Sequence, residues 1–77
     1  MLATHTIEAV SFIENLLCLQ IDGHELKIPL EKISNKLLSA SEIQRSLFKI
    51  SPSGYGIHWP LIDEDLSIDS LLKVGDQ

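Results

Sequence analysis

The residue types of the first thirty positions favour β-strands. Over 24–30, apolar and polar positions alternate with the period of a half-buried strand. Three strands are predicted, over 6–13, 16–21 and 24–30. Asp22–Gly23 separates the second strand from the third. This pair is typical of a two-residue turn in which both central residues have positive φ. Pro29 has no amide hydrogen, so the third strand should end there or lie at a sheet edge.

The period then changes from that of a strand to that of a helix. Apolar residues recur at helical spacing, and this predicts a short or broken helical turn: Leu30, Ile33 and Leu37. A better helix is expected to begin at Ser41, because Ser41 and Gln44 have the spacing of a capping box. Ile43 and Leu47 lie one turn apart behind this cap, which favours an apolar helix face.

The C-terminal half repeats the alternation of strand and helix. Strands are predicted over 48–51 and 55–59, with a turn at 52–54 that contains Pro and Gly. A final helix is predicted over 67–74, capped by Ser67 and ended by Gly75. The element order is β-β-β-α-β-β-α. We therefore predict a single α+β domain over residues 1–77, a small two-layer fold of antiparallel strands covered by the two helices.

Size and charge narrow the functional classes. The chain has 77 residues, and its six Lys and Arg against eleven Asp and Glu give a net charge of −5. A multidomain enzyme is excluded, and binding of nucleic acid through general basic charge is not expected. No basic and apolar leader or long apolar segment is seen, so we expect a cytoplasmic protein without membrane contact. The single Cys18 cannot form an internal disulfide.

No cofactor or metal is expected. The three histidines and Cys18 are scattered, with no pair at the spacing of zinc ligands. The acidic alternation that starts at Asp63 fails as a calcium loop, because Ile68 and Val74 stand where Gly and Glu are required. No nucleophile–base–acid set and no phosphate-binding loop is recognisable, so no catalytic residue is assigned and the protein is predicted not to be an enzyme. A hydrolase or metal-dependent enzyme built from His58 with Asp63 or Asp65 is the alternative.

The candidate partner-binding residues lie close together near the C-terminal end: Tyr55, His58, Trp59, Asp63, Glu64 and Asp65. Two interpretations of Trp59 are open, a core anchor or a contact residue in an interface. The three carboxylates either precede and stabilise the positive end of the last helix or attract a basic partner.

The block Gly-x-x-Trp-Pro-x-x-Asp-Glu-Asp, from Gly56 to Asp65, resembles the signature of the bacterial domain of unknown function 2442 family. The resemblance extends over nearly the whole chain through shorter shared features: Asp22–Gly23, Ile28–Pro29–Leu30, Leu37–Leu38, Ala40 to Arg45 and Leu71–Leu72. It implies a small α+β fold with no assigned catalysis. The chain departs from the family at Asn35–Lys36, where a Pro-Arg pair is usual.

Relatives in this family are often encoded beside a small toxin-like protein, which implies an antitoxin-like role. Some relatives add a DNA-binding domain, which this chain is not expected to have. The functional hypothesis is therefore a non-enzymatic protein-interaction module that acts as the antitoxin of a two-gene pair. Its partner would be a small basic protein encoded nearby, and a homo-oligomer is left open. The alternative is a ligand-sensing regulatory domain with a pocket around Tyr55, His58 and Trp59.

Overall fold

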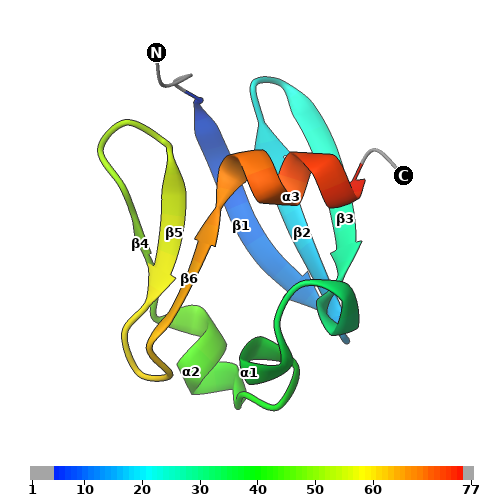
Figure 1. The fold of residues 1–77 in the computed structure, drawn as a ribbon, viewed down its shortest axis with the longest axis vertical. Helices are drawn as coiled ribbons and strands as arrows, with labels where there is room; N and C mark the ends of the chain where they lie inside the picture. Colours follow the sequence, from blue (N-terminus) through cyan, green and yellow to red (C-terminus); the bar gives the residue numbers. More distant parts are fainter. Residues whose placement is uncertain (1–4, 76–77) are drawn as a thin grey trace.

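The computed structural model describes residues 5–75, which form two three-stranded antiparallel sheets joined and covered by short helices (Figure 1). The first sheet contains the N-terminal strands in sequence order, β1 (Ile7–Ile13), β2 (Leu16–Ile21) and β3 (His24–Pro29). The second contains β4 (Lys49–Ile50), β5 (Gly56–Trp59) and β6 (Glu64–Ser67). The helical segments are η1 (Leu30–Lys32), α1 (Asn35–Leu38), α2 (Glu42–Ser46) and α3 (Ile68–Gly75). The predicted α+β class and element order are confirmed, with β6 as an added strand.

The turns of the first sheet follow the local sequence signals. Asp22 and Gly23 both have positive φ, 52° and 81°, as the predicted two-residue turn requires. Glu14 adopts a φ of 53° in the turn between β1 and β2. β3 ends at Pro29 and is an edge strand, so the missing amide hydrogen interrupts no inner pairing of the sheet.

The apolar core joins both sheets to α3, which crosses one face of the first sheet in Figure 1. Its fully buried members come from strands, helices and η1: Leu17, Leu19, Ile21, Ile28, Leu30, Leu37, Ile57, Trp59, Ile68 and Leu71. The Trp59 ring lies 6.3 Å from the Phe12 ring and 6.2 Å from the Phe48 ring. The core interpretation of Trp59 is therefore confirmed.

The helix predicted to begin at Ser41 forms with its complete capping box, but it does not cover the strands with an apolar face. Ile43 and Leu47 are 69% and 49% exposed, and no residue of α2 is buried. Arg45 holds this helix in place instead. Its guanidinium donates to the carbonyl oxygens of Leu37 and Leu38, among others, at 3.0 and 3.1 Å.

The acidic run does not lead directly into the last helix, as one interpretation expected. Asp63 lies in the turn between β5 and β6 with a φ of 50°, and Glu64 and Asp65 begin β6. This four-residue strand has a single apolar side chain, Leu66, so periodicity could not reveal it, and pairing with β5 defines it. The predicted cap at Ser67 is confirmed, because its Oγ accepts a hydrogen bond from the Ser70 amide at 3.2 Å.

Among the described residues, the longest helix is α3, and none of the helices has the length and apolar character needed to cross a lipid bilayer.

Candidate functional site: a groove on the second sheet

A row of three charged or titratable side chains crosses one face of the second sheet. Lys49 of β4 lies opposite His58 of β5, and His58 lies opposite Asp65 of β6. Because neighbouring residues of a strand point to opposite faces, these side chains lie on the face away from buried Ile57 and Trp59. The second sheet thus has one apolar face in the core and one polar face outside.

A second row runs parallel to the first, and its central position has no side chain. Gly56 of β5 lies opposite Ser67 of β6, and on its other side its carbonyl accepts a hydrogen bond from the Ser51 amide at 3.0 Å. Gly56 therefore places no side chain between the two serines, and a Cβ atom there would lie 2.9 Å from the Leu66 carbonyl oxygen. Ser51 Oγ accepts hydrogen bonds from the amides of Tyr55 and Gly56 at 2.8 and 3.0 Å, so its own hydrogen can be donated to a bound group.

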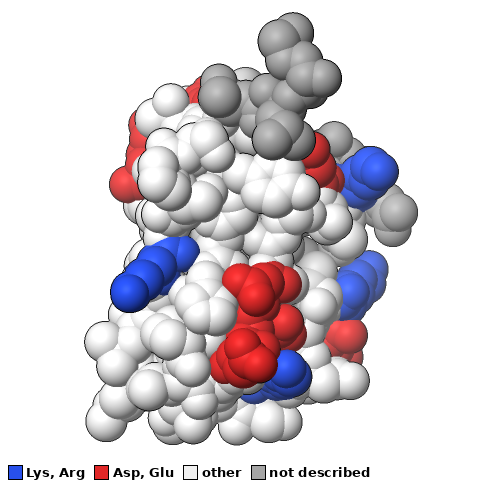
Figure 2. All heavy atoms as spheres, turned by 60° about the vertical axis from the view of Figure 1, so that its left-hand side comes forward, with Lys and Arg blue, Asp and Glu red and all other residues white. Residues whose placement is uncertain are grey.

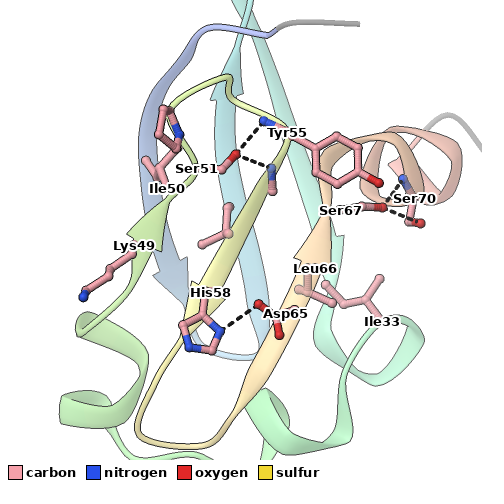
Figure 3. Close-up of a pocket in the computed structure, with 13 residues that line it drawn as sticks. Ile33, Lys49, Ile50, Ser51, Tyr55, His58, Asp65, Leu66, Ser67 and Ser70 are labelled. Atoms are coloured by element: carbon pink, nitrogen blue, oxygen red, sulfur yellow. Dashed lines mark hydrogen bonds and ion pairs between the residues drawn. The ribbon is translucent and has the colours of Figure 1, made fainter. Parts of the chain in front are cut away.

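The two rows form the floor of a groove of about 800 Å³ (Figure 3). Its rims are mainly apolar and come from four places along the chain: Ile33 before α1, Ile50 and Pro52 around the end of β4, Tyr55 before β5, and Leu66 of β6. Tyr55 and Ile50 are 43% and 40% exposed. The groove is therefore open to solvent along rims that carry large apolar side chains.

His58 and Asp65 form an ion pair or hydrogen bond in the floor of the groove. His58 Nδ1 lies 2.7 Å from Asp65 Oδ1, and the two side chains point toward one another in Figure 3. The Asp65 side chain is 76% exposed. The hydrogen bonds found within residues 5–75 place no hydroxyl on Nε2 of His58, so these residues assemble no Ser–His–Asp relay. The pair offers a charged, water-accessible contact for a binding partner.

The other two acidic candidates lie at the β5–β6 turn, outside the groove. Glu64 is half-buried and accepts hydrogen bonds from the hydroxyl of Ser34 and the amide of Asp65, so it joins α1 to β6. The Asp63 side chain is exposed, while its carbonyl oxygen accepts a hydrogen bond from Lys36 Nζ at 3.0 Å. Figure 2 shows a cluster of acidic side chains in the lower middle of this face, with a basic side chain directly beneath it.

The structure therefore divides the predicted site residues into three groups. Tyr55, His58 and Asp65 line the groove together. Trp59 lies beneath the sheet without exposed surface, so a partner could not contact it directly in this structure. Asp63 and Glu64 lie at the neighbouring turn.

Sequence reasoning missed several groove residues: Ile33, Lys49, Ile50, Ser51, Ser67 and Ser70. The strand spacing around the predicted turn at 52–54 was a usable signal, because it places Lys49 and Ser51 on the same face as His58. Nothing local to Ile33 indicated that it would lie beside β6.

Residues 5–75 contain no group of three His, Cys, Asp or Glu side chains that could hold a metal ion. Cys18 is a free thiol in the core. The arrangement on the second sheet can bind through apolar contacts, hydrogen bonds and charge.

Fold and groove together define a small α+β domain with an open, mixed polar and apolar binding surface. Residues 7–75 match the model of the protein family described as "Protein of unknown function (DUF2442)", and the chain belongs to this family. No curated protein and no solved structure matches the chain significantly.

Proposed function

We propose that this protein is a protein-interaction module that receives a segment of a partner protein in the groove of the second sheet. The observation that carries the proposal is the combination, in one open groove, of apolar rims with a polar floor. Interfaces between proteins combine apolar contacts with polar groups in this way, and tyrosine is frequent among their strongest contact residues. Tyr55 and Ile50 are the apolar anchors in this proposal.

The openness of the groove favours a chain segment over a small molecule. Pockets for small ligands bury about 70–90% of the ligand surface. Here the floor is a three-stranded sheet and the rim formed by Ile50 and Tyr55 is exposed, so a bound molecule would keep one side in water. A partner protein tolerates this well, because its remaining surface stays solvated.

Charge indicates a basic partner. The chain has a net charge of −5, and Asp65 places an exposed carboxylate in the groove, with Asp63 at the adjacent turn. A lysine or arginine side chain of the partner would pair with Asp65, and long-range attraction would speed association. In its specific form, the proposal is that the partner is a small basic toxin encoded beside this gene and that this protein is its antitoxin.

The test is co-expression with the product of the adjacent gene, followed by titration calorimetry of the purified pair. We expect a stoichiometric complex. We expect Tyr55→Ser and Asp65→Asn each to raise the dissociation constant about tenfold, which is the cost of losing one strong contact. Leu61→Ser and Glu25→Gln are the matched controls, because they remove an exposed apolar residue and a carboxylate outside the groove.

Three results would contradict the proposal in different ways. Equal weakening by the control variants would mean that the groove is not the docking surface. Absence of a complex would reject the adjacent gene product as partner. Normal growth when that product is expressed alone would reject the antitoxin role.

A ligand-sensing domain is the second candidate, and the groove volume favours it. About 800 Å³ lies within the range of roughly 300–1,000 Å³ typical of small-molecule sites, and hydroxyls of Ser51, Tyr55 and Ser70 face the space. A thermal-shift screen of metabolites distinguishes the two candidates. A compound that raises Tm in the wild type and not in Tyr55→Ser supports sensing, whereas a screen without any stabilising compound argues against it.

A further inference from the structure

His5 connects three segments that are distant in sequence. Its Nδ1 lies 2.9 Å from Oδ2 of Asp22, in the β2–β3 turn, and its Nε2 lies 3.4 Å from Oδ1 of Asp69, in the first turn of α3. Its backbone amide donates to the carbonyl oxygen of Ser53, in the β4–β5 loop, at 3.3 Å. One residue therefore contacts the first sheet, the last helix and the loop that borders the groove.

The geometry of the ring selects one protonation state. A neutral imidazole has one N–H and one acceptor nitrogen, whereas the imidazolium donates from both. Both ring nitrogens of His5 face carboxylates. An ionised carboxylate has no proton to donate, so it can only accept hydrogen bonds. A neutral His5 would direct a lone pair at one of the two carboxylates. The His5 side chain is 13% exposed, whereas the side chains of Asp22 and Asp69 are 46% and 57% exposed, so water screens part of that repulsion.

We propose that His5 is a pH-dependent clasp, closed when its ring is protonated between Asp22 and Asp69 and opened when the ring loses its proton. The proposal concerns the fold and the groove border, and it holds whether or not the groove binds a partner.

Surrounding groups set the pH range of the clasp. The hydrogen bond to Asp22, assisted by the weaker one to Asp69, raises the pKa of His5 above its ordinary 6.5 against the opposing effect of desolvation. The Thr6 amide donates a hydrogen bond to Asp22 Oδ1 at 2.8 Å, and this bond, together with the one from His5, lowers the pKa of Asp22 below 3.8. Among the other titratable groups nearby, His24 favours the ionised form of Asp22, and Glu8 accepts a hydrogen bond from the Gly23 amide.

The sign of the pH effect follows from these directions. A raised histidine pKa stabilises the folded state fully below the unfolded value of 6.5, and this stabilisation is lost as the pH rises through the higher folded pKa. The lowered pKa of Asp22 stabilises the folded state above pH 3.8, and this stabilisation is lost as the pH falls through the lower folded pKa. The clasp is therefore closed in mildly acidic solution and opens as the solution becomes alkaline.

Opening would affect the groove through Gly54. A Cβ atom at this position would lie 1.8 Å from the carbonyl oxygen of His5, so the loop backbone packs directly on His5. Gly54 has a φ of 70°, and its amide donates to the Ser51 carbonyl at 2.9 Å. The same loop carries Tyr55, and α3 carries Ser70, so two borders of the groove depend on segments that the clasp holds.

The test combines NMR titration of the three histidine rings with thermal unfolding at pH values of about 5.5 and about 8.5, on either side of the ordinary histidine pKa. In the wild type we expect His5 to titrate above 6.5, and we expect Asp69→Asn to lower its midpoint. The wild type should lose more Tm between the two pH values than His5→Gln, whose amide cannot gain a charge. The protection factor of the Gly54 amide, which is corrected for the intrinsic pH dependence of exchange, should also fall at the higher pH in the wild type and not in His5→Gln.

His58→Gln is the control, because it removes another histidine and leaves the clasp and its neighbouring charges intact. This variant should keep the His5 midpoint and the larger part of the wild-type change in Tm. A wild-type His5 midpoint at or below 6.5 would overturn the proposal, and so would a His5→Gln variant with the same pH dependence as the wild type. The wild-type titration decides the matter even if a variant folds poorly.

Discussion

Trp59 shows how one side chain can fix the relation between distant elements. Its ring contacts Phe12 of β1 and Phe48 before β4, and its indole Nε1 donates to the Arg45 carbonyl of α2 at 3.1 Å. Arg45 in turn places its guanidinium carbon 5.3 Å from the centre of the Phe12 ring. The first sheet, α2 and the second sheet therefore meet at Trp59, whose large ring makes apolar contacts and whose single N–H group donates a hydrogen bond.

Replacement of Trp59 should separate these two contributions. We expect Trp59→Ala to lower the free energy of unfolding by about 3–5 kcal/mol, the range for deleting a large buried aromatic side chain. Trp59→Phe keeps a ring but leaves the Arg45 carbonyl without its donor, for a loss of about 1–3 kcal/mol. Urea unfolding followed by circular dichroism measures both. Exposed Leu61→Ala is the control, and equal stability of Trp59→Ala and Leu61→Ala would contradict the assignment.

At the scale of elements, the two serine caps differ in what surrounds them. Ser41 caps α2 in an exposed capping box with Gln44. Ser34 is buried, accepts a hydrogen bond from the Leu37 amide at 3.1 Å and donates to the Glu64 carboxylate of β6. One cap acts within its own helix, whereas the other also fixes that helix to the second sheet.

Alanine substitution should therefore cost more at Ser34 than at Ser41. Loss of an exposed cap typically costs about 0.5–2 kcal/mol, and an unsatisfied buried partner adds about 1–3 kcal/mol at Ser34. Thermal unfolding of Ser34→Ala and Ser41→Ala side by side measures the difference. Ser34→Thr, which keeps the hydroxyl, should recover part of the loss. A larger loss at Ser41 would mean that the Ser34–Glu64 contact contributes nothing.

The elements also show which parts of the fold local sequence determines. The Asp22–Gly23 turn, the Ser41 capping box and the end of β3 at Pro29 were predictable, because a few neighbouring residues specify each one. β6 was not, because its strand conformation depends on pairing with β5. The exposure of Ile43 could not be predicted either, because the tertiary contacts of Arg45 orient α2.

The candidate site follows the same division. Residue type and proximity in sequence identified Tyr55, His58 and Asp65. The place of Gly56 in the groove floor depends on cross-strand register, and the approach of Ile33 depends on the path of the chain before α1; a single sequence reveals neither.

On the scale of the whole molecule, the two sheets differ in size and in their share of the core. β2 is a six-residue central strand with Leu17, Leu19 and Ile21 fully buried. β4 has two exposed residues at the edge of the second sheet. The groove thus lies on the less extensive sheet, and its border loop is held at His5 and Ser53 by one long backbone hydrogen bond of 3.3 Å.

Amide hydrogen exchange should therefore separate the two halves of the fold. Local opening requires little free energy where few apolar contacts and few strand hydrogen bonds must break. We expect the slowest exchange at Leu17 and Leu19, intermediate exchange in β5, and the fastest exchange in β4 and α2. NMR-detected exchange at constant pH measures this order. Equal protection of Ile50 and Leu19 would show instead that the two sheets open as one cooperative unit, and the groove could then change shape only with global unfolding.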